Sequence, residues 1–153
     1  MFLKKEYWII FFTFLIDQIT KYFGHKIFYY KVTSFFNIAF SKNYGTTFGF
    51  FQCYPCWTHR IIFLMIAVIF VFAVFLLTQA KKTSERIAYS MIVGGALGNI
   101  VDRLSYGYVI DFLQFHYQRW YYPVFNFADA FIVIGIGILI LFQLRSESVL
   151  KKS

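Results

Sequence analysis

The sequence predicts an all-α membrane protein with four transmembrane helices and a small extracytoplasmic β-sheet between the first two helices. Hydrophobic residues make up 59% of the 153 residues and charged residues only 14%, which is too few charges to cover the exterior of a soluble domain. Four apolar segments approach the ~20 residues that a helix needs to cross a bilayer. We expect these segments to form one integral membrane domain over residues 1–153.

The four apolar segments run approximately over residues 7–22, 61–77, 86–104 and 126–144. The first is short for a span, so we expect either local thinning of the bilayer or helix ends that reach the interface. It lacks a small-residue cleavage site, which indicates an uncleaved span rather than a removable signal peptide. By the positive-inside rule, the basic residues that flank the two termini and the second connection place both termini in the cytoplasm. These residues are Lys4, Lys5, Lys81, Lys82, Arg86, Arg145, Lys151 and Lys152.

Residues 24–59 form the one long connection, and we expect this outer loop to be β-rich. Its stretch from 27 to 52 is rich in Phe, Tyr, Val and Thr, which favour strands. Open strand edges cannot face lipid, so a small sheet here is expected to lie at the membrane interface. The second outer stretch, 105–125, carries Trp120, Tyr121 and Tyr122, which are typical of an interfacial aromatic belt.

Four aspartates lie at the ends of apolar segments or just beyond one of them: Asp17, Asp102, Asp111 and Asp129. Carboxylates in or near hydrocarbon are costly and tend to mark functional sites. Successive helices cross the bilayer in opposite directions, so all four aspartates are expected at the same face. The three glutamates are expected at the other face as ordinary solvated charges beside Lys or Arg: Glu6, Glu85 and Glu147.

Asp111 and Asp129 are candidates for acid–base chemistry, and the residues alone rank Asp102 no lower than Asp111. Asp129 lies three residues after Asn126, the spacing of an N-cap with a carboxylate that reaches back to it, and taken alone this pair favours a structural role. Asp111 has apolar neighbours in what we interpret as a loop, where desolvation favours the neutral form of a carboxyl group. With a second carboxylate nearby, the two can share one proton, as in aspartic proteases.

Polar residues also gather near the end of the third segment. Asn99, Asp102 and Arg103 lie at positions i, i+3 and i+4 and project towards one face of a helix. Two interpretations stay open: an Asp–Arg pair that closes the helix end, or a polar shelf that orients a substrate backbone. Just upstream, Gly94 and Gly98 form a GxxxG pattern, which lets another helix approach closely.

Two local patterns complete the candidate residues. Asp17 and Lys21 are spaced as an i, i+4 ion pair on the first segment, which is most often structural. In the outer loop, Asn43 and Gly45 belong to a predicted turn in which Gly45 supplies a positive φ.

The sequence predicts neither a metal site nor a nucleic-acid interface. Cys53 and Cys56 form a lone CxxC, interpreted as two loop thiols or a local disulfide, because zinc would need further ligands nearby. The three histidines have no metal-ligand spacing, and the motifs of serine hydrolases and zinc peptidases are missing from the sequence. The net charge of +8 comes from basic residues scattered at segment ends, which favours headgroup anchoring over nucleic-acid binding. We expect no cofactor.

Taken in order, five clusters resemble the lipoprotein signal peptidase family, signal peptidase II of bacterial inner membranes. The clusters span nearly the whole chain, and their fixed order beside the right membrane segments makes the resemblance specific. One departure is Thr47, where the family usually has alanine or serine. The matching clusters are residues 17–21 (DQITK), 43–49 (NYGTTFG), 94–103 (GGALGNIVDR), 109–112 (VIDF) and 125–129 (FNFAD).

The resemblance implies a four-helix membrane aspartyl peptidase with an outer β-cradle and an extracytoplasmic active site. Its substrates would be prolipoproteins with a diacylglyceryl-modified cysteine, cut on the N-terminal side of that cysteine. The resemblance assigns the catalytic dyad to Asp111 and Asp129. The residues that it implies for substrate binding or orientation are Asn99, Arg103, Asn126, Asn43 and Gly45. The residues that it implies as supports are Asp17, Lys21 and Asp102.

We therefore expect one dyad carboxylate to activate water while the other, protonated, donates to the scissile carbonyl oxygen. Asp129 is expected to hold the negative charge because it begins a helix. The expected partners are lipid-modified prolipoproteins and membrane lipid, bound by a monomer. A proton- or ion-coupled transporter would also need acids in its spans, but it would place them near the midplane rather than at one face. A membrane chaperone or assembly factor would need no convergent carboxylates.

Overall fold

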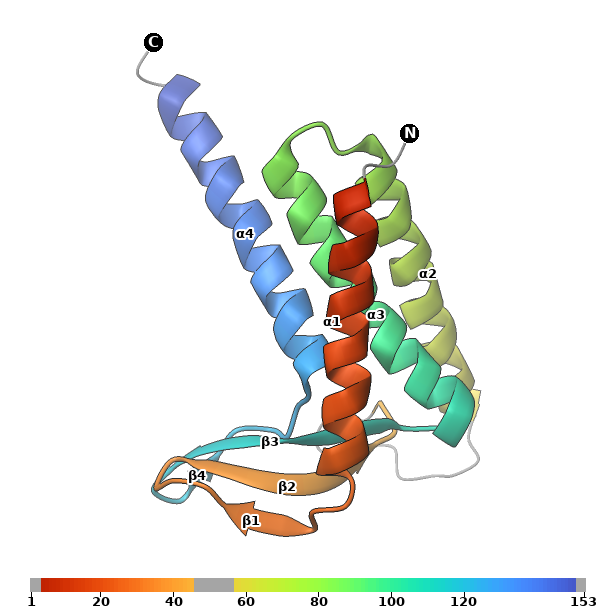
Figure 1. Ribbon diagram of the computed structural model, residues 1–153, viewed down its shortest axis with the longest axis vertical. Coiled ribbons are helices and arrows are strands. Elements are labelled where there is room, and N and C mark those ends of the chain that lie inside the picture. The colour runs from red at the N-terminus through yellow and green to blue at the C-terminus, as the bar shows by residue number, and fades with distance from the viewer. Residues whose placement is uncertain (1–3, 46–56, 151–153) are drawn as a thin grey trace.

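Four helices stand side by side on one small sheet in the computed structural model, which describes residues 4–45 and 57–150 (Figure 1). Each helix extends beyond its predicted segment. The first has 21 residues and reaches about 30 Å at 1.5 Å per residue, which is longer than its predicted apolar segment. The helices are α1 (Lys4–Gly24), α2 (Trp57–Gln79), α3 (Thr83–Tyr106) and α4 (Phe127–Leu150).

The helices differ in how apolar they are. Within the described residues, two stretches are long and apolar enough to cross a membrane, Ile61–Gln79 in α2 and Phe127–Arg145 in α4. Much of the surface of these two stretches is exposed apolar side chain. By contrast, α1 and α3 carry buried charged residues that contact each other, which lowers the mean hydropathy of both helices.

The sheet has four antiparallel strands in the order β1-β2-β3-β4. The strands are β1 (Tyr29–Lys31), β2 (Phe36–Asn43), β3 (Val109–Tyr117) and β4 (Trp120–Tyr121). We expected the sheet within residues 24–59 alone, and this is wrong, because β3 and β4 come from the connection between α3 and α4. That connection was expected to be only an aromatic belt. The predictions for Thr47, Cys53 and Cys56 fall outside the described residues.

The register between β2 and β3 places the start of β3 beside the end of β2. Ser41 pairs with Asp111 and Asn43 pairs with Val109, after a bulge between Ile38 and Ser41. Because a one-residue slip would turn every side chain of a strand to the opposite face, this register decides which way the Asp111 side chain points.

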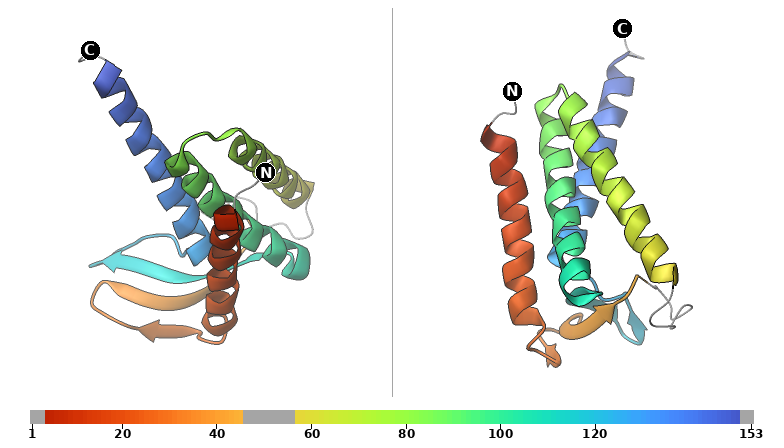
Figure 2. Two further views of the ribbon diagram at one scale, coloured as in Figure 1. Left: turned by 45° about the horizontal axis from the view of Figure 1, so that its top comes forward. Right: turned by 90° about the vertical axis from the view of Figure 1, so that its right-hand side faces the viewer.

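Helix α3 packs against each of the other helices and stands between α1 and α2, with α4 behind (Figure 2). Its glycines make this possible. A Cβ atom on Gly94 would meet Thr13, and one on Gly98 would meet the Asp17 carboxylate, both on α1. On another face, a Cβ atom on Gly95 would meet the α4 backbone. The close approach predicted from the GxxxG pattern is confirmed.

The end of the bundle away from the sheet corrects one expectation about the glutamates. Glu6 is 5% exposed and its Oε1 lies 2.6 Å from Nε of Arg86, so it belongs to a buried ion pair between α1 and α3. Glu85 is half-buried and accepts hydrogen bonds at the start of α3, including one from the backbone N–H of Lys82. The side chain of Glu147 lies outside the described part of the chain.

Candidate active site

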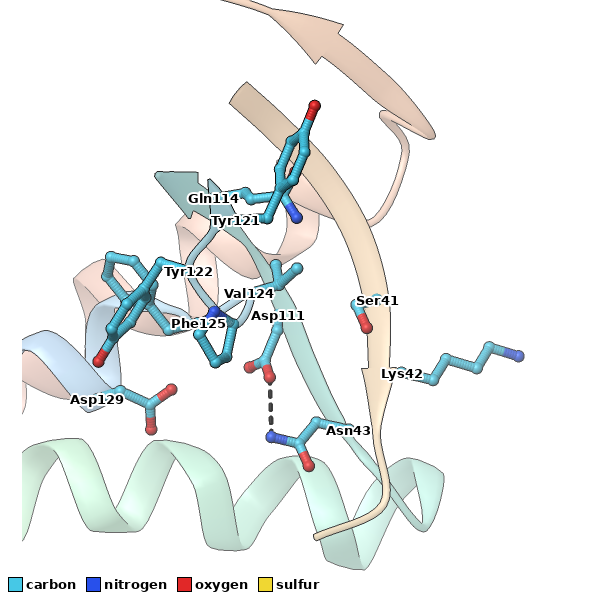
Figure 3. Close-up of a pocket in the computed structure, with 11 residues that line it drawn as sticks. Ser41, Lys42, Asn43, Asp111, Gln114, Tyr121, Tyr122, Val124, Phe125 and Asp129 are labelled. Atoms are coloured by element: carbon cyan, nitrogen blue, oxygen red, sulfur yellow. Dashed lines mark hydrogen bonds between the residues drawn. The ribbon is translucent and has the colours of Figure 1, made fainter. Parts of the chain in front are cut away.

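A cleft of about 620 Å³ lies where β2, β3, the segment after β4 and the first turn of α4 meet. Figure 3 shows the carboxylates of Asp111 and Asp129 pointing into the same space from different elements. The cleft therefore brings together the two aspartates singled out as an acid–base pair. Its lining residues are Ser41, Lys42, Asn43, Asp111, Gln114, Tyr121, Tyr122, Pro123, Val124, Phe125 and Asp129.

Asp111 is held on strand β3, not in a loop as the sequence interpretation had it. Its residue is 1% exposed, and both carboxylate oxygens accept hydrogen bonds. Asn43 Nδ2 donates to Oδ2 at 2.9 Å, and Asn126 Nδ2 donates to Oδ1 at 2.7 Å. The strand was missed because Val109 and Ile110 precede Asp111 without polar alternation, so the segment lacks the period-two pattern of a half-buried strand.

Asp129 lies in the first turn of α4, where the predicted capping box is confirmed. Asn126 Oδ1 accepts from the backbone N–H of Asp129 at 3.0 Å, and Asp129 Oδ2 accepts from the backbone N–H of Asn126 at 3.2 Å. Asp129 Oδ1 also accepts from Asn99 Nδ2 at 2.8 Å. The Asp129 carboxylate is therefore held at the start of α4 by donors from both the backbone and the Asn99 side chain.

Asn126 links the two carboxylates directly. Its side-chain oxygen accepts from the backbone N–H of Asp129. Its amide nitrogen donates to Asp111 and, at 3.1 Å, to Asn99 Oδ1. It is fully buried, so water cannot replace these bonds. One asparagine thus sets the position of Asp111 relative to Asp129.

The environment raises the pKa of Asp111 from 3.8 to about 7. Burial is the largest cause, and the negative charge of Asp129 adds to it, whereas the hydrogen bonds from Asn43 and Asn126 act in the opposite direction. A carboxyl group with this pKa can hold a proton near neutrality and still release it.

Arg103 adds positive charge beside the pair. Its guanidinium donates from Nη1 to the backbone oxygen of Asn99 at 3.2 Å, and its charge interacts with those of Asp129 and Asp111. The possible Asp102–Arg103 pair is not the arrangement found, because the Asp102 carboxylate contacts Lys21 instead.

Lys21 sits at the centre of a buried ion triad formed by Lys21, Asp17 and Asp102. Its Nζ lies 2.7 Å from Asp17 Oδ2 and 2.9 Å from Asp102 Oδ2, and it donates to Asn99 Oδ1 at 2.9 Å. All three triad residues are at most 2% exposed. The predicted i, i+4 pair is confirmed, but it is half of a larger arrangement that also orients Asn99.

The two carboxylates of the triad also accept from backbone. Asp17 Oδ1 accepts from the N–H of Ala128 at 2.9 Å, in the first turn of α4. Asp102 Oδ2 accepts from the N–H of Ile110 at 3.0 Å, next to Asp111. The ion triad therefore anchors both segments that carry the candidate acids.

The predicted turn at Asn43 and Gly45 is confirmed. Gly45 has a φ of +89°, and its N–H donates to Asn43 Oδ1 at 2.8 Å. With its oxygen occupied by this turn, Asn43 presents its amide nitrogen to Asp111.

Gln18 was missed by the sequence interpretation. Its Nε2 donates to Asp17 Oδ2 at 3.2 Å, to Asp102 Oδ1 at 3.1 Å and to the backbone oxygen of Gly98 at 3.3 Å. The only sequence signal for Gln18 was its position inside the 17–21 cluster. Adjacent residues on a helix ordinarily point in different directions, so spacing alone did not predict that Gln18 would contact Asp17.

The cleft holds two carboxyl groups in unlike surroundings. Among residues 4–45 and 57–150, His, Cys, Asp and Glu side chains form no group of three that could hold a metal ion. Asp129 accepts hydrogen bonds from the Asn99 side chain and the Asn126 backbone at the start of a helix, whereas Asp111 is a buried carboxyl with a pKa of about 7. Such a pair can activate a water molecule and protonate a leaving group.

Comparison with known proteins gives consistent matches. The family described as Signal peptidase (SPase) II matches residues 9–145. The lipoprotein signal peptidase of Pasteurella multocida is 40% identical over 92% of this chain and 90% of its own length. The lipoprotein signal peptidase of Shewanella piezotolerans is 38% identical over 97% of this chain and 91% of its own length. A bacterial membrane enzyme solved at 2.3 Å resolution superposes with a TM-score of 0.81, at 27% identity over 96% of this chain and 92% of that one. The chain therefore belongs to the signal peptidase II family, the membrane proteases that process bacterial lipoproteins.

Proposed function

We propose that this protein is an aspartyl endopeptidase that removes the signal peptide from diacylglyceryl-modified prolipoproteins. It cuts the peptide bond on the N-terminal side of the lipidated cysteine. The observation that carries this proposal is the pairing of Asp111 and Asp129 in one cleft, joined through Asn126 and held on separate segments.

In the proposed mechanism, Asp129 is the ionised base and Asp111 the protonated acid. Asp129 withdraws a proton from a water molecule as the water oxygen attacks the scissile carbonyl carbon. Asp111 donates its proton to the carbonyl oxygen, which gives a tetrahedral diol and leaves Asp111 ionised. The proton held by Asp129 then goes to the amine nitrogen as the C–N bond breaks, and one hydroxyl proton of the diol returns to Asp111. The raised pKa of Asp111 supports this division of roles.

The neighbouring polar residues divide into two groups. Asn99 and Asn126 use their side chains on the carboxylates and on each other, so their role is to position the acids rather than to contact substrate. Arg103 is the group whose positive charge would stabilise a developing oxyanion. Its charge already interacts with both carboxylates.

We infer that all four helices cross the membrane as a single domain, with the sheet and the cleft at the extracytoplasmic face and both termini in the cytoplasm. Exposed aromatic side chains on the strands, including Tyr30, Tyr117 and Trp120, suit the headgroup region. A substrate would then reach the cleft laterally, with its acyl chains still in the bilayer.

The direct test of the function mixes the purified protein with a diacylated prolipoprotein and detects the released signal peptide by mass spectrometry. Asp111→Asn and Asp129→Asn should each abolish cleavage in folded protein. Glu85→Gln, at the opposite end of α3, is the matched control and should cleave at the wild-type rate. Full activity in either dyad variant would refute the aspartyl mechanism, and equal cleavage of a substrate without lipid would refute the substrate class.

The orientation has its own test. In a variant with Cys53 and Cys56 replaced by Ser, a cysteine introduced at Tyr30 should react with a membrane-impermeant thiol reagent added outside the cell. Tyr30 is 61% exposed, so reagent access depends on the side of the membrane. Reaction only after the membrane is permeabilised would overturn the inferred orientation.

A further inference from the structure

A second cleft of about 420 Å³ adjoins the candidate active site, and its lining is almost entirely apolar. One wall consists of four aromatic residues from β3, β4 and the segment before α4: Phe115, Trp120, Tyr122 and Phe125. The other side is the outer face of α4 at Val133 and Ile134. We call this cleft the aromatic groove.

The aromatic wall is formed by rings that contact one another. Phe115 stacks on Phe125 with centroids 5.8 Å apart, Tyr122 meets Phe125 edge-on at 6.0 Å, and Trp120 lies 6.1 Å from Tyr122. Through these contacts the four rings form one continuous wall. Sites for apolar ligands are typically pre-formed in this way.

The aromatic groove begins at the candidate acid pair. Tyr122, Phe125 and Asp129 line both clefts, so the two spaces adjoin at these three residues. Val133 lies one helical turn beyond Asp129 on the same face of α4. From this junction the aromatic groove follows the exposed apolar surface of α4, where Val133 is 67% and Ile134 is 50% exposed.

We propose that the aromatic groove binds an acyl chain of the diacylglyceryl group while the adjoining polar cleft binds the peptide. This inference rests on the proposed function and adds where the lipid goes. The scissile bond and the lipid-bearing sulfur belong to the same cysteine. A substrate placed for attack at Asp129 therefore has its lipid only a few bonds from the junction of the two clefts.

The aromatic groove fits an acyl chain better than the apolar helix of a signal peptide. A helix with its side chains is about 10–12 Å across, so it would touch only the outer rim of a cavity of this volume. An unbranched flexible chain can lie between the aromatic wall and α4. Because a chain leaving the bilayer gains little from exchanging one apolar environment for another, the main effect of the aromatic groove is to orient the cysteine at the acids.

The test fills the aromatic groove with Val133→Trp and compares two substrates that share one peptide but carry palmitoyl or hexanoyl chains. For the palmitoyl substrate we expect kcat to fall about tenfold, equivalent to about 1.4 kcal/mol, with KM within about twofold of wild type. For the hexanoyl substrate, the fall should largely disappear, because the short chains need little of the aromatic groove. Val71→Trp on α2 is the matched control and should change neither value, since Val71 is 65% exposed and outside the groove.

Two results would overturn the proposal. The first is an equal change in kcat for both acyl lengths, or no change for either. The second is an effect that follows the length of the apolar signal segment at constant acyl length, which would assign the aromatic groove to the signal helix. Ile134→Trp fills the aromatic groove from the same side, α4, and serves as the test variant if Val133→Trp does not fold.

A binding measurement separates failure of this inference from failure of the proposed function. The chain has three tryptophans, and in the variant Trp8→Phe, Trp57→Phe only Trp120 remains. A diacylglyceryl-cysteine peptide with a brominated acyl chain should quench its fluorescence, whereas bromine on the peptide's apolar segment should not. If the wild type cleaves no prolipoprotein, the proposed function fails, but quenching still reports occupancy of the aromatic groove. Absence of quenching in an active enzyme overturns the groove proposal alone.

Discussion

Asp111→Asn should inactivate the enzyme and at the same time stabilise it above neutral pH. The pKa of Asp111 is raised from 3.8 to about 7, so the ionised form is unfavourable in the folded protein. A pKa difference of about 3 at about 1.4 kcal/mol per unit puts the cost of ionisation near 4 kcal/mol. The amide removes this cost because it carries no charge.

Hydrogen bonding offsets part of the gain. Asn43 and Asn126 both donate to Asp111, and an amide has only one oxygen to accept them. Leaving one buried donor unpaired costs about 1–3 kcal/mol. The net stabilisation expected at alkaline pH is therefore about 1–3 kcal/mol.

The sign of the pH dependence follows from proton binding. Between about pH 4 and 7 the folded protein binds more protons at Asp111 than the unfolded chain does, so the unfolding free energy of the wild type falls as the pH rises through this window. The variant lacks this fall. Its advantage should appear at about pH 8 and vanish or reverse at about pH 5, where the wild-type carboxyl is already neutral.

Thermal unfolding in detergent at the two pH values measures the effect. Asp102→Asn is the matched control, because it also neutralises a buried aspartate but breaks the contact with Lys21. It should destabilise the protein at both pH values. An Asp111→Asn variant that is less stable than the wild type at alkaline pH would refute the reasoning.

Three further predictions follow from the structure. Lys21→Met leaves two buried carboxylates without their cation and should lower the unfolding free energy by about 3–5 kcal/mol; an unchanged unfolding temperature would contradict the ion triad. Gly98→Ala places a methyl group against the Asp17 carboxylate and should lower the unfolding temperature. Gly137→Ala, with open space around it, is the control and should be neutral or slightly stabilising. Similar effects of both substitutions would contradict the helix packing. The kcat/KM for cleavage should fall as the pH rises through about 7, because Asp111 must carry a proton to act as the acid; steady-state rates across this range check it, and a flat profile would argue against that role.

The sequence predicted the features that depend on neighbours along the chain. The cap at Asn126 and Asp129, the Asp17–Lys21 pair and the positive φ of Gly45 are set within a few residues, and all three are confirmed. The expectation that the aspartates lie at one end of the bundle followed from the alternating direction of successive helices. Each of these inferences needs only local spacing or the direction of a helix.

The features that the sequence did not predict depend on contacts between distant segments. No spacing rule could pair Lys21 with Asp102, because they lie on different helices. Strand β3 was interpreted as a loop because its first four residues are all buried and lack alternation. Glu6 was expected in water because its burial depends on Arg86 of another helix.

The bond from Asp17 to the backbone of Ala128 joins residues 111 positions apart in the sequence. Its consequence concerns biogenesis. Until the last helix has inserted and docked against the first, Asp129 has no fixed place opposite Asp111, so a nascent chain carries no assembled hydrolytic centre. Under the proposed mechanism, hydrolysis by any one molecule would therefore begin only after its last helix is in place.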